Sequence, residues 1–202
     1  NFSLYNCTLW MDKPEGTWSE IRVHTNATFT MIDSSIRPTQ ELEDYIVNEI
    51  GLGSAYGFVI GADDIPNVDP WAQLDISNSD IFMTHIRLKY ANASIENSNF
   101  HGYYYNNVSA IPDGLWSENS FLDIQNSTFI DYEQGFRSIG YLANYNNVSC
   151  LNCSFLMSQE WWTNDISLLN TNGLNINYSK LVKYLDSSIS CYNLAFCSII
   201  KF

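Results

Sequence analysis

Three aspartates in one short stretch, Asp63, Asp64 and Asp69, are the residues of this chain best suited to acid–base or metal chemistry. Paired carboxylates serve hydrolases as general acid and general base. Carboxylate oxygens are also the ligands that Ca²⁺ prefers. Because Pro66 and Pro70 give the stretch an irregular backbone, we expect a solvated acidic loop, and a Ca²⁺ site at these three aspartates is the less favoured alternative.

Nucleophilic and transition-metal chemistry find little support in the sequence. The three histidines, His24, His85 and His101, do not have the spacing of a zinc site. No serine lies in the Gly-x-Ser-x-Gly context of a hydrolase nucleophile. We therefore expect a protein that is not an enzyme and that holds no metal or cofactor.

The five cysteines are unevenly spaced. Cys150 and Cys153 are separated by two residues, Cys191 and Cys197 by five, and Cys7 stands alone. In a secreted chain the four C-terminal thiols are expected to form two disulfides, and the spacing leaves three connectivities open. Cys7 is expected to be either a free buried thiol or a link to a neighbouring subunit.

Nine Asn-x-Ser/Thr sequences could carry N-linked glycans, which indicates a secreted glycoprotein, although a chain rich in Asn, Ser and Thr also forms them by chance. Asn92, Asn107 and Asn147 stand in polar stretches just before predicted strands, so we expect them to be exposed and modified first. The other acceptors are Asn1, Asn6, Asn26, Asn126, Asn152 and Asn177.

An eight-residue phrase recurs along the whole chain and sets the positions of these residues. In its clearest copy, Leu122–Phe129, apolar and polar residues alternate up to an Asn, which is followed by Ser or Cys, any residue and Phe, Ile or Leu. Alternation of this kind is typical of a strand buried on one face. Close copies start at Phe2, Leu74, Ala93 and Val148, and looser ones at Phe29, Gly57, Leu174 and Ile189. The spacing averages about 23 residues, which is typical of repeat architectures.

The fifth position of the phrase predicts a one-residue bend between two short strands, because Asn and Gly adopt the left-handed backbone conformation most readily. The bend residues are Asn6, Asp33, Gly61, Asn78, Asn97, Asn126, Asn152, Tyr178 and Asn193. We expect the side chains of Asn78, Asn97, Asn126 and Asn152 to point inward and stack as a hydrogen-bonded ladder. A buried bend asparagine could not also carry a glycan.

Strand, bend, strand and loop, repeated nine times, predict an all-β fold with one domain over residues 1–202, a parallel β-helix of about nine coils. A β-sandwich or jelly roll is the alternative, but it gives no reason for the same bend residue to recur. Residues 38–73 interrupt the pattern as an irregular insertion. Within it, acidic residues after Pro38 and apolar residues at four-residue spacing predict one short helix near 39–50.

The phrase resembles those of right-handed parallel β-helix proteins of the pectin-lyase-like class and of extracellular repeat proteins. The resemblance covers essentially the whole chain and implies the architecture. Polygalacturonases of this class carry Asn-Thr-Asp, Asp-Asp, His-Gly and Arg-x-Lys in that order. This chain has Asp63-Asp64, then Arg87-Leu-Lys89, then His101-Gly102, and Asn-Thr-Asp is absent. The resemblance therefore implies no activity.

Composition restricts the partners. A net charge of −13 argues against binding to nucleic acid or to anionic membrane surfaces. No apolar run reaches the roughly 20 residues that cross a bilayer. The chain starts at Asn1 already inside a repeat, so we expect a processed mature chain or a piece of a longer one.

The function we predict follows from the absence of caps on the repeat. End coils expose unpaired strand edges, which other copies of the chain, stacked head to tail, or adjoining segments of a longer chain would cover. We therefore expect a secreted or cell-surface, glycosylated structural or adhesive protein that forms an extracellular filament. The alternative is a carbohydrate-binding or polysaccharide-degrading β-helix, for which the aromatic clusters Tyr103–Tyr105 and Trp161–Trp162 could provide sugar platforms.

Overall fold

The computed structural model describes most of the chain. Its backbone description leaves out 13–17, 46–56, 64–70, 103, 106–107, 110–112, 131, 133, 140–146, 158–165, 170–172, 178–179, 184–188, 193–196 and 200–202. Side chains are described for 1–12, 20–45, 71–102, 114–130, 132 and 148–154.

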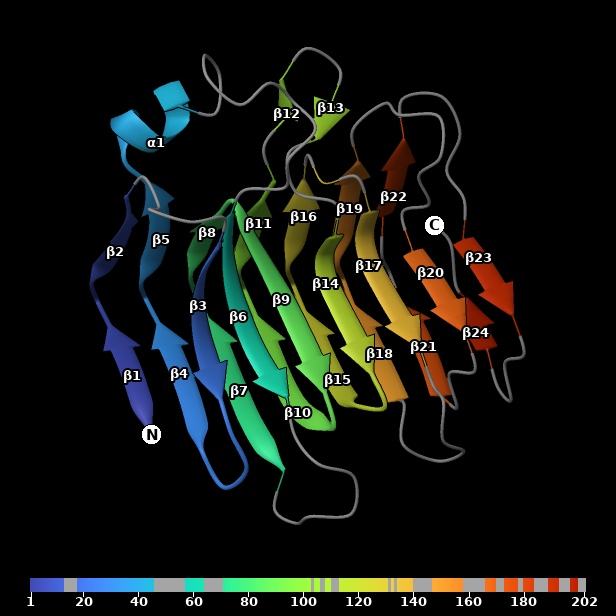
Figure 1. Cartoon of the computed structure of the whole chain (residues 1–202). Helices are drawn as coiled ribbons and strands as arrows, with labels where there is room; N and C mark the ends of the chain where they lie inside the picture. The colour runs from blue at the N-terminus through green and yellow to red at the C-terminus, as the bar shows by residue number, and fades with distance from the viewer. Residues whose placement is uncertain are drawn as a thin grey trace.

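Almost all described strands belong to three parallel sheets (Figure 1). The first sheet contains β1 (Phe2–Tyr5), β4 (Thr28–Ile32), β7 (Ala72–Ser77), β10 (Ala91–Glu96), β15 (Phe121–Gln125), β18 (Asn147–Leu151), β21 (Gly173–Asn177) and β24 (Cys197–Ile199). The second contains β2 (Thr8–Met11), β5 (Ser35–Pro38), β8 (Asp80–Phe82), β11 (Asn99–His101), β16 (Thr128–Ile130), β19 (Ser154–Met157) and β22 (Lys180–Lys183). The third contains β3 (Trp18–Val23), β6 (Gly57–Asp63), β9 (Thr84–Lys89), β14 (Asp113–Glu118), β17 (Gln134–Ile139), β20 (Ile166–Leu169) and β23 (Ile189–Tyr192).

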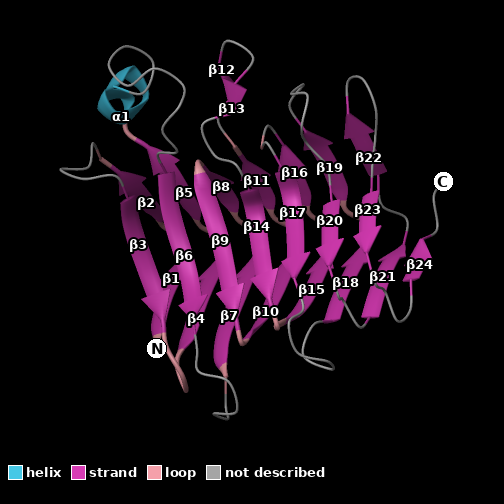
Figure 2. Cartoon of the chain, turned by 45° about the vertical axis from the view of Figure 1, so that its right-hand side comes forward, coloured by secondary structure: helices cyan, strands magenta, loops and turns pink. Residues whose placement is uncertain are grey.

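The chain visits the three sheets in turn, and each strand pairs with the equivalent strand of the next turn (Figure 2). We call one pass through the three sheets a coil. The described strands make seven coils, followed by β24 in the first sheet. Parallel pairing throughout these sheets does not fit the sandwich alternative, whose sheets are antiparallel.

The predicted bend is confirmed wherever the structure describes an Asn or Asp at it. Each of these residues has a positive φ close to 50°, in the left-handed region, and each joins a strand of the first sheet to a strand of the second. They are Asn6, Asp33, Asn78, Asn97, Asn126 and Asn152. Successive coils are 27, 45, 19, 29 and 26 residues apart at this corner. The corner is therefore constant while the rest of each coil varies in length.

Two of the predicted repeat copies are wrong. Residues 57–63 form β6, which runs through Gly61 without a bend, and residues 189–192 form β23; both strands lie in the third sheet, and the predicted bend residue Asn193 is outside the described residues. Gly61 consequently pairs with Arg22 and Arg87 as an ordinary strand residue. The described strands make seven coils and the first strand of another, fewer than the predicted count of about nine.

The third sheet lies in segments for which the sequence predicted loops. Its strands β3, β14, β17 and β20 occupy the predicted connections between phrases, and β6 occupies part of the predicted irregular insertion. In register these strands share one column of large apolar residues, but no fixed bend residue follows it, so the search for the phrase did not mark them. The column holds Ile21, Ile60, Ile86, Leu115, Phe136, Ile166 and Ile189. Only register with the neighbouring coils places them in a sheet.

Inward residues of neighbouring coils pack in columns along the stack. In the first sheet, β7 alternates buried and half-buried residues, as the phrase predicted. In the second sheet, Phe100 and Phe129 stack with ring centroids 4.6 Å apart at an interplanar angle of 5°. Tyr132 is fully buried and donates a hydrogen bond from its hydroxyl to the Thr84 carbonyl at 3.1 Å. Burial raises the pKa of Tyr132.

The predicted inward asparagine ladder is wrong, because Asn78, Asn97, Asn126 and Asn152 are all exposed. At these corners the residue in left-handed conformation is exposed and the residue after it is buried. Two of these side chains do bond across coils at the surface, where the Asn152 amide donates to Asn126 Oδ1 at 2.8 Å.

The residue after each corner asparagine forms the buried ladder instead. Ser98 Oγ donates to the Glu96 carbonyl at 2.8 Å and accepts the Ser79 backbone N–H at 3.2 Å. The same pair of bonds recurs from coil to coil. Its described buried members are Ser34, Ser79, Ser98, Ser127 and Cys153, and the exposed Cys7 begins it at the first coil. The ladder satisfies backbone N–H groups that the corner removes from the sheets.

The one described helix, α1 (Gln40–Tyr45), lies where the sequence predicted it and leaves the second sheet after β5. Thr39 caps it, because its Oγ1 accepts the Leu42 N–H at 3.3 Å. Leu42 is buried against the core. A two-residue hairpin pair, β12 (Tyr104–Tyr105) and β13 (Val108–Ser109), is the described antiparallel element.

Candidate functional site: the open first coil and the polar corner groove

The first coil forms one end of each sheet in the described structure. β1, β2 and β3 each pair with a strand on one side only. Backbone N–H and C=O groups on their other side point away from the stack, so this end can extend all three sheets. We call these three strands the open first coil.

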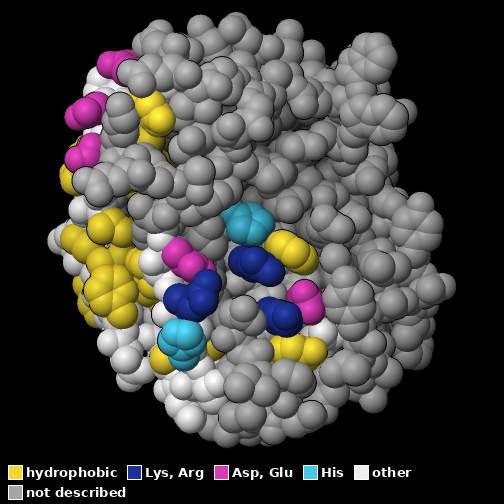
Figure 3. Space-filling view, viewed as in Figure 1, with side chains coloured by type: hydrophobic (Ala, Val, Ile, Leu, Met, Phe, Trp, Pro, Cys, Tyr) yellow, Lys and Arg dark blue, Asp and Glu magenta, His cyan; other side chains and the backbone are white. Residues whose placement is uncertain are grey.

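Large apolar side chains accompany this end. Phe2, Tyr5 and Trp10 are 48%, 59% and 60% exposed. Phe2 also stacks on Phe29 of the next coil, with ring centroids 5.8 Å apart. Figure 3 shows hydrophobic side chains gathered at this edge of the molecule. The open first coil therefore combines unpaired backbone with apolar surface.

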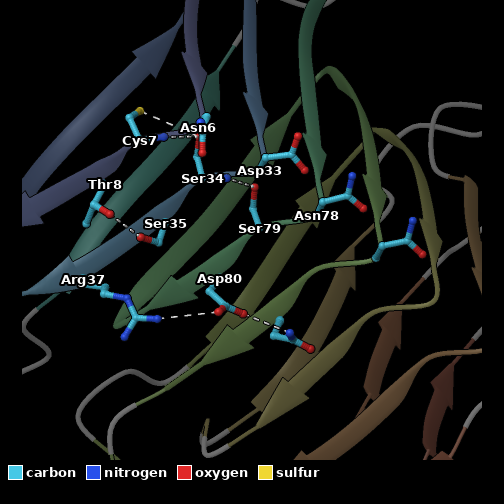
Figure 4. A pocket seen from close by; sticks show the side chains of 12 residues that line it. Asn6, Cys7, Thr8, Asp33, Ser34, Ser35, Arg37, Asn78, Ser79 and Asp80 are labelled. Atoms are coloured by element: carbon cyan, nitrogen blue, oxygen red, sulfur yellow. Dashed lines mark hydrogen bonds and ion pairs between the residues drawn. The ribbon is translucent and has the colours of Figure 1, made fainter.

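A polar groove begins at the open first coil and follows the corner between the first and second sheets (Figure 4). It has a volume of about 550 Å³. Its walls carry the outward corner residues, the ladder residues and the first residues of the second-sheet strands. They are Asn6, Cys7, Thr8, Asp33, Ser34, Ser35, Arg37, Asn78, Ser79, Asp80, Asn97 and Asn99. We call this the corner groove.

Bonds between coils fix the side chains of the corner groove. Thr8 and Ser35 hydroxyls are 2.9 Å apart. Asp80 accepts a hydrogen bond from Asn99 at 3.0 Å and forms an ion pair with Arg37 at 3.7 Å. The groove thus offers amide, hydroxyl and carboxylate groups to a polar ligand. Among the residues described with side chains, no three His, Cys, Asp or Glu come together as a metal site.

A second, less polar groove lies on the outer face of the second sheet beneath α1. It has a volume of about 520 Å³ and is lined by Trp10, Arg37, Pro38, Thr39, Gln40, Glu43 and Phe82. The Arg37 guanidinium lies 4.6 Å from the centre of the Phe82 ring, which in turn stacks on His101. We call it the Trp10 groove, since Trp10 is its most exposed aromatic residue.

The fragments compared with polygalacturonases converge only in part: Asp63 of β6 pairs in register with Lys89 of β9, but the His101-Gly102 fragment lies in another sheet. Arg87 and Lys89 lie on β9 in the third sheet, whereas His101 lies on β11 in the second. Arg87 covers the Trp116 ring at 4.6 Å, and Lys89 pairs with Glu118 at 3.8 Å. Asp63 ends β6, and its side chain, like Asp64 and Asp69, is outside the described residues.

The exposure of the glycan acceptors differs from the prediction. Asn92 is half-buried inside β10 rather than exposed in a loop. Asn147 opens β18, its side chain is outside the described residues, and Asn107 is outside them entirely. The exposed acceptors are Asn1, Asn6, Asn26, Asn126 and Asn152, and the side chain of Asn177 is not described. The corner acceptors are accessible because the asparagine side chain points outward.

The three cysteines with described side chains are Cys7, Cys150 and Cys153, and none of them forms a disulfide in this structure. Cys7 is exposed, so the prediction of a buried thiol at this position is wrong. Its sulfur lies 3.8 Å from Ser34 Oγ at the open first coil. Cys191 lies in β23 and Cys197 in β24, and their side chains are outside the described residues.

The sequence analysis did not group the residues of the Trp10 groove, where Trp10 by itself suggested only packing against a loop, and it did not predict the serine ladder. The recurring Ser or Cys after the corner asparagine was part of the phrase, and it was the sequence signal for the buried ladder. Trp10, Arg37 and Phe82 are far apart in sequence and come together only because they hold equivalent positions in successive coils.

Comparison of the chain with protein-family models, with curated proteins and with solved structures finds no match. The described part of the chain contains no helix with the length and apolar character needed to cross a membrane.

Proposed function

We propose that the three parallel sheets form a right-handed parallel β-helix and that the protein is a structural or adhesive component of an extracellular filament. The strand order supports the architecture, since each coil passes through three sheets and pairs with the coil before and after it. The observation that carries the function is the open first coil. Three unpaired strand edges lie together there with exposed aromatic side chains.

The partner of the open first coil is a further coil, from a second copy of this chain or from an adjoining segment of a longer one. A coil of the same shape would pair with β1, β2 and β3 at the usual spacing of about 4.8 Å. It would also cover Phe2 and Trp10. Stacking between copies is a head-to-tail contact, which propagates as a filament when it does not close on itself.

Secretion and glycosylation belong to the same proposal. Support comes from the exposed acceptors at the corners, Asn6, Asn126 and Asn152. Asn126 and Asn152 lie in adjacent coils and bond to each other. Glycans on neighbouring corners would crowd, so we expect only one of these two asparagines to be fully occupied in native material.

Electron microscopy of the purified protein tests the stacking. The wild-type chain should form filaments, and Tyr5→Glu combined with Trp10→Glu should keep it monomeric by placing charge on the apolar edge. Leu151→Glu is the matched control. Leu151 is 38% exposed but lies in β18, which is paired on both sides. Filaments that persist in the double variant, or compact wild-type monomers at all concentrations, would contradict the proposal.

The second candidate function is carbohydrate binding in the Trp10 groove. An exposed tryptophan beside Arg37, Gln40 and Glu43 provides an apolar platform for a sugar ring and hydrogen-bonding groups for its hydroxyls. Glycan-array binding that is lost in Trp10→Ala and kept in Leu151→Ala would support it. If the wild-type protein binds no glycan as a monomer, this candidate fails and the filament proposal is unaffected.

A further inference from the structure

The sixth coil differs from its neighbours at the corner between the first and second sheets. Two inward positions there hold cysteine, whereas coils three to five hold isoleucine and serine. Cys150 pairs with Ile124 and occupies the isoleucine column. Cys153 follows Ser127 in the buried ladder. The substitutions therefore fall on two positions that the corner brings together in every coil.

The two thiols are close to each other and shielded from solvent. Each is 1% exposed, and they are hydrogen-bonded to each other. Cys153 Sγ also approaches the Leu151 carbonyl at 3.4 Å. The chain turns between the cysteines at Asn152, whose φ is 53°. Leu151 and Asn152 are exposed, so opening of this one corner uncovers both sulfurs.

The shared hydrogen bond makes the two thiols unequal. It lowers the pKa of Cys153, against the effect of burial. The same bond, together with burial, raises the pKa of Cys150. Because the thiolate is the reactive form, Cys153 is the sulfur that attacks first.

We propose that Cys150 and Cys153 form a corner-spanning disulfide site, which closes by exchange with a small-molecule disulfide such as oxidised glutathione. The Cys153 thiolate attacks one sulfur of the small disulfide, which forms a mixed disulfide and releases one thiolate. Cys150 then loses its proton to solvent and attacks Cys153 Sγ, and the second thiolate leaves. Two protein thiols are oxidised, and one small disulfide is reduced to two thiols.

Register separates this pair from the other cysteines. Cys197 pairs with Leu174, which pairs with Val148, so β24 lies two coils beyond β18. Two coils correspond to about 10 Å, more than the roughly 7 Å that a disulfide spans between Cα atoms. Cys191 lies in the third sheet of the seventh coil. Of the connectivities open from the sequence, this geometry favours closure within the sixth coil.

Peptide mapping tests the site directly. Trypsin should release residues 138–180 as one peptide, since no Lys or Arg lies between Arg137 and Lys180, and this peptide contains no other cysteine. The native protein is equilibrated with oxidised and reduced glutathione, denatured, alkylated and deglycosylated. We expect this peptide to be lighter by two hydrogens than the dithiol form and to carry no alkyl group. With excess reduced glutathione it should carry two.

The neighbouring coils supply the control variants. Cys153→Ser restores the ladder residue of coils two to five, and Cys150→Ile restores the column residue of coils three to five, so both variants should fold. Oxidised glutathione should raise the melting temperature of the wild-type protein. It should not change the melting temperature of either variant. Two alkyl groups on the wild-type peptide after oxidation, or a bond from it to another peptide, would overturn the proposal.

Discussion

Two adjacent residues at each corner have different roles in turning the chain. The asparagine takes the left-handed conformation, and the serine after it bonds to its own coil and to the coil before it. Asparagine suits this position because of its backbone preference and not because of buried side-chain contacts, since its side chain is exposed. Backbone conformation and buried hydrogen bonding can therefore be separated by mutation.

We predict that Asn97→Gly leaves the free energy of unfolding nearly unchanged, because glycine adopts positive φ freely. Asn97→Ala should lower it by about 1–2 kcal/mol, since alanine pays the left-handed penalty. Ser98→Ala should cost about 1–3 kcal/mol, because it leaves the buried Ser79 N–H without its acceptor. Urea denaturation of the three variants measures these values. A larger loss in Asn97→Gly than in Ser98→Ala would show that the asparagine side chain matters after all.

Tyr132 should make stability fall in alkaline solution. An unfolded tyrosine has a pKa of about 10. Below that pH the phenol of Tyr132 is neutral in both the folded and the unfolded protein, so its full contribution to the free energy of unfolding is present. Since burial raises the pKa of Tyr132 in the folded protein, only the unfolded state ionises as the pH rises above that value. The free energy of unfolding should then drop by about 1.4 kcal/mol per pH unit.

The matched variant for this effect is Tyr132→Phe. It should cost about 1–3 kcal/mol near neutral pH, where the Thr84 carbonyl loses its donor. The difference between the two proteins should shrink as the pH rises above about 10. Parallel pH profiles for wild type and variant would contradict the assignment.

Strands of the second sheet are short, and inward stacking supports them. β8, β11 and β16 have three residues each, so few backbone bonds hold any one of them. Phe100 and Phe129 are both fully buried and stack in this sheet. The outer face of the same sheet carries a second stack, Phe82 on His101 at 4.3 Å, which is only half-buried.

We predict that Phe100→Ala lowers the free energy of unfolding by about 3–5 kcal/mol, because it leaves a cavity between coils. Phe82→Ala is the control on the outer face. It should cost about 1 kcal/mol, the usual contribution of an exposed cation–aromatic contact. Chemical denaturation compares the two variants. Equal losses would mean that the outer stack supports the sheet as much as the core does.

Stacking of whole molecules has to overcome the repulsion of a net charge of −13. The open first coil presents strand edges and aromatic residues, and these favour a directional, largely apolar contact. Cys7 lies at this end and is exposed in the single chain. It is therefore a natural reporter of whether another coil covers the edge.

We predict that Cys7 reacts readily with a maleimide in monomeric protein and is protected in filaments. Trypsin places it in a peptide from Asn1 to Arg22, or to Lys13, without another cysteine. Cys7→Ser is the matched control, because serine holds this ladder position in coils two to five. It should assemble as the wild type does. Unchanged labelling in filaments would place the contact elsewhere, and oligomers that collapse with reductant would identify a covalent link.

The corner and the alternating strands of the first sheet could be predicted from the sequence because both depend on local residue preferences. The left-handed preference of Asn at positions such as Asn78 and Asn126, and a two-residue period before it, need no distant partner. Helix α1 was readable for the same reason, from its own residues and Thr39. Burial of one strand face is likewise encoded residue by residue, so the all-β class followed.

Tertiary structure decided what depends on neighbouring coils. The third sheet has one shared apolar column but no recurring bend residue, so strands such as β6 were recognisable only from the hydrogen-bonding partners that a coil on each side offers them. The direction of the corner side chain was decided by how the first and second sheets meet, which turned Asn97 outward and put Ser98 inside. The two grooves depend on the register between coils, and the Cys150–Cys153 pair depends on how the corner turns the chain. Neither can be read from residue spacing along the sequence.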